Sequence, residues 1–148
     1  MVRGPLPEEE FHAIFSRVAR LTVEVVIADP QRGVLLSLRE TGPCAGLWHL
    51  PGGTVRFAEP VVDAVARVAR DELGIAVAAG PLLGVIEYPS HYEHGLDSPV
   101  GMAFRAVRAG ELPPLDALRS QCRWFARLPA EIHDEQREFL IAHLLGET

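Results

Sequence analysis

One acidic side chain stands where a helix would normally carry an apolar residue. If residues 60–73 form a helix with about 100° per residue, the valines at 61, 65 and 68 share one face and Glu72 lies among them. A buried carboxylate is costly unless a positive charge compensates it or it stays protonated. The pattern therefore predicts that Glu72 meets a bound divalent cation, pairs with an arginine, or lies at an exposed edge of the helix.

Three arginines have side chains suited to binding phosphate. Arg39 is expected at the end of a strand and is a candidate clamp for a diphosphate, because the guanidinium fork matches phosphate oxygens. Arg56 and Arg119 are further candidates for the same task. Arginines at strand ends are also common for structural reasons, so the pattern leaves both roles open.

A loop expected at residues 89–99 carries the candidates for a general base. His91 and His94 lie in this loop together with Glu93, and histidine is the natural base near neutral pH. Loops also collect surface histidines that have no catalytic role, so the identity of the base stays open.

Several rings are expected near a ligand pocket. His49 precedes Pro51 and is expected to line the pocket. Tyr88 and Tyr92 have rings that could stack on a nucleobase, whereas Trp48 is expected to pack in the core.

Hydrophobic periodicity and turn signals predict the elements that position these residues. Helices are expected at 8–19, within an N-terminal segment 1–20, and at 60–73 and 134–145, with Gly74 ending the second one. Strands are expected at 21–28, 33–39, 47–50, 100–109 and 121–126, and residues 75–88 read as extended structure broken near Gly80-Pro81. The turn between the first two strands predicts a hairpin. Residues 1–148 are expected to form one α+β domain.

Composition excludes several classes of partner. The net charge of −6 argues against binding to nucleic acid, which favours a basic surface. Cys44 and Cys122 fit no metal-binding or redox spacing and are expected to be reduced thiols. The sequence has no secretory signal and no apolar run long enough to span a membrane, which predicts a cytoplasmic protein with no membrane partner.

The stretch from Gly53 to Ile75 resembles the Nudix box, whose pattern is G-x5-E-x7-R-E-U-x-E-E-x-G-U with U apolar. Gly53, Glu59 and Arg67 stand at the first glycine, the first glutamate and the arginine. Asp71 and Glu72 stand at the acidic pair, and Gly74 and Ile75 complete the pattern. Val68 replaces the glutamate that normally follows the arginine. A match at this spacing is more specific than a lone glycine motif.

The resemblance implies a Nudix-type α/β/α sandwich, with a mixed β-sheet and the box at 51–75 as a loop–helix–loop. Within this superfamily the sequence is similar in particular to GDP-mannose mannosyl hydrolases, which also lack the glutamate after the arginine. In that likeness Arg39 contacts phosphate and Glu24 stands where an aspartate contacts the base. The likeness fails at the late loop, where Leu118 and Arg119 stand in place of the histidine base and the glutamine metal ligand.

The resemblance also implies a metal site, and a contact between Glu59 and Arg67 that braces the loop–helix–loop of the box. Glu72 is the expected metal ligand and a catalytic residue. Backbone carbonyl oxygen at Gly52 or Gly53 is expected to be a further metal ligand. Asp71 either reaches the water shell of the ion or pairs with Arg67. Oxygen ligands suit Mg²⁺ or Mn²⁺. Because Val68 removes a carboxylate, the site is expected to hold fewer ions.

Arg67 is expected both to bind substrate and to brace the box with Glu59. The catalytic set is therefore expected among Glu72, Arg39, His91 and His94.

These residues predict a metal-dependent hydrolase of a nucleoside diphosphate linked to another group, with a nucleotide sugar such as GDP-mannose favoured. Two alternatives stay open: a house-cleaning pyrophosphatase for nucleoside triphosphates, and a Nudix-fold domain that binds nucleotide without catalysis. Attack at carbon and attack at phosphorus are both compatible with the residues. The resemblance also implies a homodimer, with the apolar face of the first helix as a possible contributor.

Overall fold

The computed structural model describes residues 4–108 and 121–145, so Leu118 and Arg119 lie outside the described part of the chain. Its helices are α1 (Glu8–Phe15), α2 (Val61–Val68), α3 (Pro89–Tyr92) and α4 (Asp134–Leu140), with π-helical turns η1 (Ala69–Leu73) and η3 (Ile141–Leu145). Its strands are β1 (Arg20–Val26), β2 (Ala28–Asp29), β3 (Gly33–Leu38), β4 (Trp48–His49), β5 (Gly52–Thr54), β6 (Val77–Glu87), β7 (Pro99–Arg108) and β8 (Cys122–Phe125). No helix within the described ranges is long and apolar enough to cross a membrane.

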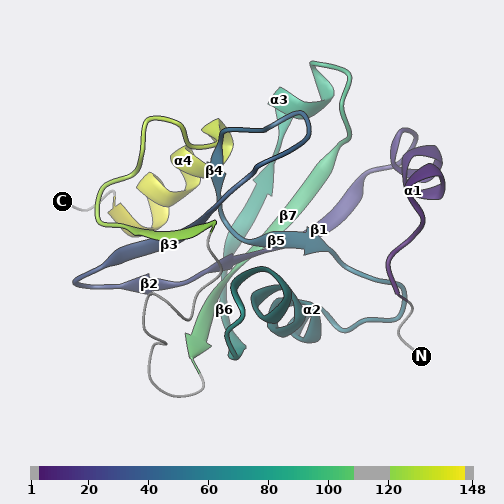
Figure 1. Ribbon diagram of the computed structural model, residues 1–148. Helices are drawn as coiled ribbons and strands as arrows, with labels where there is room; N and C mark the ends of the chain where they lie inside the picture. The colour runs from purple at the N-terminus through teal and green to yellow at the C-terminus, as the bar shows by residue number, and fades with distance from the viewer. Residues whose placement is uncertain (1–3, 109–120, 146–148) are drawn as a thin grey trace.

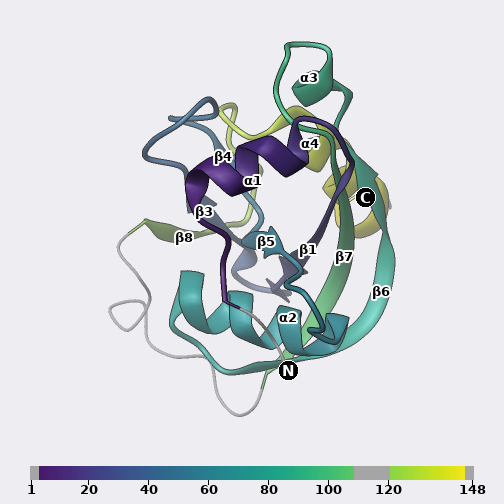
Figure 2. The ribbon, with the colours of Figure 1, turned by 90° about the vertical axis from the view of Figure 1, so that its right-hand side faces the viewer.

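A mixed sheet with the order β5-β1-β7-β6 forms the centre of the fold (Figure 1). β1 and β7 run parallel, whereas β5 and β6 pair antiparallel with their neighbours. β6 and β7 lie side by side along their length (Figure 2). At the β5 edge, Glu24 of β1 is the register partner of Gly52. This edge therefore brings the start of the Nudix-like stretch next to a buried acid.

The two faces of this sheet contact different helices, as the period-two alternation of strand side chains requires. On one face, Val23 and Val25 pack in a core with Val65 and Val68 of the α2 helix. On the other face, Val26 packs in a second core that includes residues of α4. Figure 1 shows the strands between these two helices. The predicted α/β/α sandwich with a mixed sheet is confirmed.

A second, antiparallel sheet was not anticipated. β3 pairs with β2, β4 and β8. The predicted hairpin forms only between β2 and β3, because the chain leaves the central sheet after Val26 and Ala28–Asp29 pairs with Gly33–Val34 instead.

The helix expected at 60–73 is α-helical only to Val68 and continues as the π-helical turn η1. Gly74 ends it with φ of 75°, a left-handed conformation that favours glycine, as predicted. The glycine pair before it belongs to strand β5 rather than to a loop. Glu72 lies in the π turn, a feature that often occurs at functional sites.

Three other predicted boundaries were wrong. α1 ends at Phe15, short of residue 19, and has no buried residue. The loop at 89–99 contains the short helix α3, which begins at a proline. The closing helix at 134–145 is α-helical only to Leu140. The break near Gly80-Pro81 is confirmed as a shift of register inside one continuous strand, β6.

Candidate active site

A cavity opens at the β5 edge of the central sheet, where several elements converge. β1 contributes Thr22 and Glu24 to its lining, and β5 contributes Gly52 and Gly53. Other lining residues come from the loops and helices around them, including Arg39, Cys44, His49, Tyr88, His91, His133 and Gln136. The cavity therefore gathers residues from most of the length of the chain.

Glu72 contacts the wall of this cavity. The main-chain N–H of Gly52 donates to Oε2 of Glu72 over 3.3 Å. Burial raises the pKa of the Glu72 carboxyl, while the Gly52 hydrogen bond and the positive charge of Arg39 act in the opposite direction. The carboxylate predicted to lie on the apolar face is therefore held next to the glycine pair.

Glu24 lines the cavity and is only 6% exposed. Its Oε1 accepts hydrogen bonds from the hydroxyls of Thr22 and Tyr88, each 3.0 Å long. Burial raises the pKa of Glu24 to about 7, against the lowering effects of the hydrogen bonds from Tyr88 and Thr22 and of the charge of Arg20. The nearby Glu72 raises this pKa further.

Two glycines make room for the Glu24 carboxylate. A Cβ added at Gly52 would overlap Oε2 of Glu24, and a Cβ added at Gly101 would lie 2.5 Å from Oε1. Gly52 therefore separates the two acids, with its N–H directed at Glu72 and its Cα next to Glu24.

A chain of hydrogen bonds links Glu24 to Leu50, two residues before the glycine pair. The Leu50 N–H donates to Oε1 of Gln136 over 2.6 Å, and Nε2 of Gln136 donates to the Tyr88 hydroxyl over 3.0 Å. Tyr88 in turn donates to Glu24. Tyr88 is 2% exposed, so the prediction that its ring stacks on a nucleobase was wrong: the ring is enclosed by protein and its hydroxyl orients a carboxylate.

The two acids fit a hard divalent cation. Within residues 4–108 and 121–145, neither Glu24 nor Glu72 forms an ion pair with an arginine. Burial without a cation is costly, and carboxylate oxygens are the ligands that Mg²⁺ and Mn²⁺ favour. The alternative that Glu72 pairs with an arginine does not occur in this part of the chain.

Arg67 and Glu59 form the predicted brace. Nε of Arg67 donates to Oε2 of Glu59 over 2.6 Å, and one Nη donates both to Oε1 of Glu59 and to the Thr54 carbonyl. These bonds tie the last turn of α2 to Glu59, just before the helix, and to Thr54 of β5. The Arg67 side chain does not line the cavity, and its donors are engaged in the brace rather than directed at a substrate.

Asp71 lies away from the cavity. Its side chain is 50% exposed and contacts Arg67 at 3.9 Å and Arg70 at 3.6 Å. Asp71 was expected either to reach the water shell of the ion or to pair with Arg67. In the structure it pairs with Arg67.

Val68 packs where the missing glutamate of the pattern would stand. It is 2% exposed and belongs to the core against α2. A Cβ added at Gly53 would lie 3.1 Å from a Val68 methyl group. The valine therefore closes the apolar side of the glycine pair.

Arg39 lines the cavity, as a phosphate clamp requires, and its side chain is exposed. Among the described residues it forms no ion pair. His49 also lines the cavity as predicted, and burial lowers its pKa to about 4. Arg56 is not part of the lining.

The two predicted bases have different positions. His91 lines the cavity, where its Nδ1 lies 3.0 Å from Oδ1 of Asp97 and its Nε2 lies 2.9 Å from Nε2 of His133. His94 is exposed, and its Nδ1 lies 2.8 Å from the Ser90 carbonyl oxygen. The structure thus brings only His91 to the cavity.

Sequence reasoning missed His133, Gln136 and the position of Cys44. These residues belong to no motif, because Cys44 is far in sequence from His133 and Gln136 at the start of α4 and meets them only in the folded chain. His133 directly precedes the acidic start of α4, which was the one local signal in the sequence.

Comparisons with known proteins agree with this architecture. The NUDIX domain family matches residues 18–142. The low-salt glycan biosynthesis protein Agl8 of Haloferax volcanii is 34% identical over 141 residues, which are 93% of this chain and 90% of that protein. An ADP-ribose pyrophosphatase of Methanocaldococcus jannaschii is 35% identical over 69 residues, covering 47% of this chain and 41% of that protein.

A solved structure has the same fold. The crystal structure of a MutT NUDIX hydrolase from Burkholderia pseudomallei superposes with a TM-score of 0.71 and 30% identity, covering 86% of this chain and 99% of that one. With the box, the sandwich and a family match over most of its length, the chain belongs to the Nudix family and is a Nudix hydrolase.

Proposed function

We propose that this enzyme hydrolyses a nucleoside diphosphate linked to a second group, with a nucleotide sugar such as GDP-mannose favoured, and that it requires Mg²⁺ or Mn²⁺. The observation that carries the proposal is the pair of acids next to Gly52, the buried Glu24 and the half-buried Glu72. Buried carboxylates without an arginine are stabilised when a divalent cation binds between them.

Glu72 and Glu24 would hold the ion, together with backbone carbonyl oxygen at Gly52 or Gly53. When bound, the ion neutralises charge on the diphosphate and orients it. The protein supplies the positions of these oxygens: Gly52 orients Glu72 through its N–H, and Tyr88 and Thr22 orient Glu24. This arrangement leaves few protein ligands, which suits an ion that also contacts substrate oxygen.

Arg39 would bind the diphosphate from the other wall of the cavity. Its exposed guanidinium lines the cavity, and its positive charge lowers the pKa values of both Glu72 and His49. A guanidinium that is not paired with an acid of the described chain can donate two parallel hydrogen bonds to phosphate oxygens.

The relatives support a sugar-linked substrate. One relative is named for glycan biosynthesis and another for hydrolysis of ADP-ribose, which is itself a nucleoside diphosphate linked to a sugar. The MutT name of a structural relative makes a nucleoside triphosphate the second substrate class to test.

A substrate panel tests the proposal. Nucleotide sugars, ADP-ribose and nucleoside triphosphates would be incubated with the metal-free enzyme and with added Mg²⁺ or Mn²⁺, and products separated by anion exchange. The proposal predicts metal-dependent turnover of sugar-linked diphosphates. Preferred turnover of triphosphates would contradict the substrate class, and turnover in excess chelator would contradict the metal requirement.

Isotope-labelled water then distinguishes the two possible bonds. Attack at the sugar carbon places the label on the free sugar, whereas attack at phosphorus places it on a phosphate. Mass spectrometry of the two products identifies the attacked atom directly.

A further inference from the structure

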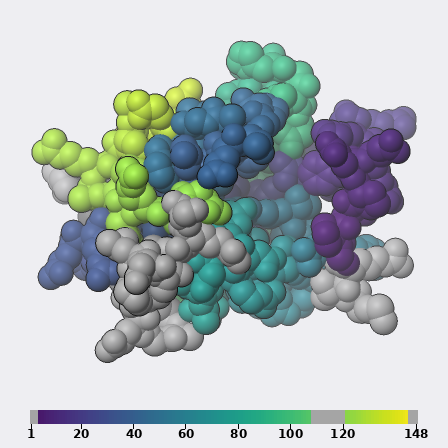
Figure 3. Space-filling view, in the orientation of Figure 1, coloured from purple at the N-terminus to yellow at the C-terminus, as the bar shows by residue number. Residues whose placement is uncertain are grey.

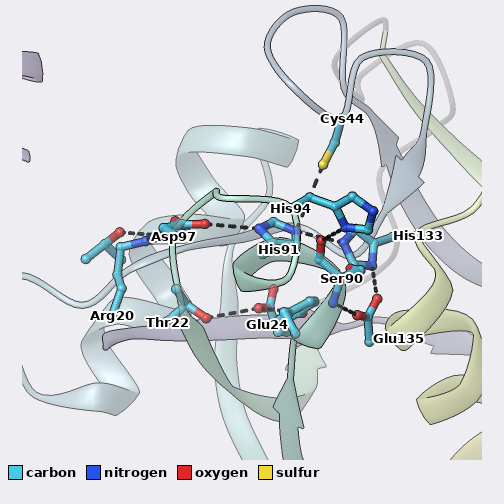
Figure 4. A network of polar contacts seen from close by, with 12 residues as sticks. Arg20, Thr22, Glu24, Cys44, Ser90, His91, His94, Asp97, His133 and Glu135 are labelled. Atoms are coloured by element: carbon cyan, nitrogen blue, oxygen red, sulfur yellow. Dashed lines mark hydrogen bonds and ion pairs between the residues drawn. The ribbon is translucent and has the colours of Figure 1, made fainter. Parts of the chain in front are cut away.

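A second group of potential ligands meets on the cavity wall, apart from Glu24 and Glu72. Cys44 comes from the loop between β3 and β4, His91 from α3, and His133 from the residue before α4. Their ligand atoms all lie within 4.8 Å of one another. Figure 4 shows the three side chains converging, and Figure 3 shows the blue loop that carries Cys44 between the yellow-green segment and α3.

The first histidine is oriented by a carboxylate. Nδ1 of His91 lies 3.0 Å from Oδ1 of Asp97, and Nε of Arg20 donates to Oδ2 of the same acid over 2.9 Å. A neutral imidazole next to a carboxylate carries its proton on the nitrogen that faces the acid. Nε2 of His91 therefore presents a lone pair to the cavity.

The second histidine also has a carboxylate near its Nδ1, at a longer distance and without a hydrogen bond of good geometry. Nδ1 of His133 lies 3.3 Å from Oε2 of Glu135, whose Oε1 accepts a hydrogen bond from the Ser90 N–H over 2.8 Å. His133 is 7% exposed, and its buried Nδ1 makes no hydrogen bond of good geometry with the described part of the chain. Its Nε2 likewise faces the group.

If both rings carry their proton on Nδ1, their two Nε2 lone pairs face each other. The Nε2 atoms of His91 and His133 are 2.9 Å apart, and Sγ of Cys44 lies 4.0 Å from Nε2 of His91. Two lone pairs at that distance repel unless they share a proton or bind one cation. Each ring has a carboxylate behind it, which is the arrangement that supports histidine ligands of zinc.

We propose that Cys44, His91 and His133 bind one zinc-class divalent ion. Tetrahedral zinc with Zn–N of about 2.0–2.1 Å and Zn–S of about 2.3 Å needs nitrogens about 3.3 Å apart and sulfur about 3.6 Å from each. The observed N–N distance of 2.9 Å and the Cys44–His91 distance of 4.0 Å differ from these values by a few tenths of an ångström, and the sulfur lies within 4.8 Å of a His133 nitrogen. Cys44 lies in a loop and is only half-buried, so its side chain can make that adjustment.

Three protein ligands leave a fourth position for water or a substrate oxygen. All three residues line the cavity, so this position opens toward it. Thiolate and imidazole select a softer ion than the carboxylate pair, so this site is distinct from the proposed Mg²⁺ or Mn²⁺ site. The inference goes beyond the proposed function, which uses the two carboxylates, backbone carbonyl oxygen at the glycine pair and Arg39. It makes His91 a ligand rather than the general base.

Cobalt(II) titration of the metal-free, reduced protein tests the site without any nucleotide. We expect one Co²⁺ per chain, the intense visible absorption of a tetrahedral complex, and a near-ultraviolet thiolate-to-cobalt band. Zn²⁺ should displace Co²⁺ stoichiometrically, whereas excess Mg²⁺ should not. Metal analysis after dialysis against Zn²⁺ gives an independent measure of stoichiometry.

Matched variants identify the ligands. Cys44→Ser should abolish the thiolate band and His91→Gln should remove tight binding, whereas Cys122→Ser and His94→Gln should keep both. Asp97→Asn should weaken Zn²⁺ binding about 10–100-fold, because it removes the acid behind His91. Circular dichroism confirms that each variant is folded.

Stoichiometric binding that survives Cys44→Ser, or a Co²⁺ complex without a thiolate band, would overturn the site, as would the absence of bound Zn²⁺. Because no substrate is present, these outcomes are independent of the turnover panel.

Discussion

The main-chain N–H of Gly52 points at the carboxylate of Glu72, with 3.3 Å between the nitrogen and Oε2. The two residues are twenty positions apart, and the contact joins the edge strand β5 to the π-helical turn after α2. This contact explains why an acid occupies the apolar side of the helix. The Glu72 side chain extends past the apolar residues, and its carboxylate accepts a hydrogen bond from Gly52 at the cavity wall.

Gly52→Ala tests the space between the two acids. The added methyl group would overlap the Glu24 carboxylate, so we expect a loss of about 1–3 kcal/mol in the free energy of unfolding. Activity should also fall, because Glu24 must move. Gly4→Ala is the control, since no atom lies within 4 Å of the added group. Equal stability of the two variants in urea would argue against this packing.

Glu24 predicts a pH dependence of stability in metal-free protein. Burial raises its pKa in the folded state from 4.5 to about 7, so the folded state favours the protonated acid. The resulting stability is fully present below about pH 4.5 and is lost as pH rises to about 7, by about 3 kcal/mol in all. Urea unfolding in chelator should show this decline. Glu24→Gln should flatten it, and an unchanged slope in that variant would assign the effect to another group.

The substitution Val68→Glu restores the family pattern at a buried position. A charged side chain in this core should cost about 2–3 kcal/mol or more without metal. Mn²⁺ should then raise the melting temperature of this variant more than that of the original protein, because the new carboxylate lies one turn before Glu72. Val62→Glu, at a site 55% exposed on the same helix, should show neither effect. A Mn²⁺ response no larger than in the original protein would contradict the prediction.

The brace between Arg67, in the last turn of α2, and Glu59, just before the helix, should depend on the planar shape of the guanidinium. Arg67→Lys keeps the charge but loses the two parallel bonds to Glu59 and the bond to Thr54, so we expect a loss of about 1–2 kcal/mol. Arg70→Lys, at a side chain 69% exposed, should be neutral. Thermal unfolding of both variants checks the difference. Equal melting temperatures of Arg67→Lys and Arg70→Lys would show that a positive charge at position 67 is sufficient and that the two parallel bonds to Glu59 add no stability.

The box and the sandwich were predictable because their signals are local. The fixed spacing of the motif identified Glu59, Arg67 and Glu72. Gly74 correctly predicted where the helix ends. Arg39 and His91 were also placed correctly at the cavity. The box residues follow from a motif in one segment, whereas His91 was one of several candidates in a loop, and the roles of Arg39 and His91 stay predictions.

The rest of the site depends on contacts between distant segments. Glu24 was assigned to base contact from the resemblance to GDP-mannose mannosyl hydrolases, but its burial depends on glycines at 52 and 101 that leave room for its carboxylate. His91 and His133 are 42 positions apart, and no periodicity relates them. The π turn was missed because apolar spacing alone does not distinguish it from the end of an α-helix.

The most direct test of the central claim compares Glu72→Gln with Asp63→Asn, an exposed acid on the same stretch of helix. Initial rates on a nucleotide sugar would be measured across a Mn²⁺ titration, with folding checked by circular dichroism. The account predicts that Glu72→Gln lowers kcat by at least about 100-fold, or about 2.7 kcal/mol, while Asp63→Asn keeps the original rate and metal response. A folded Glu72→Gln enzyme with the original Mn²⁺-dependent rate would contradict it.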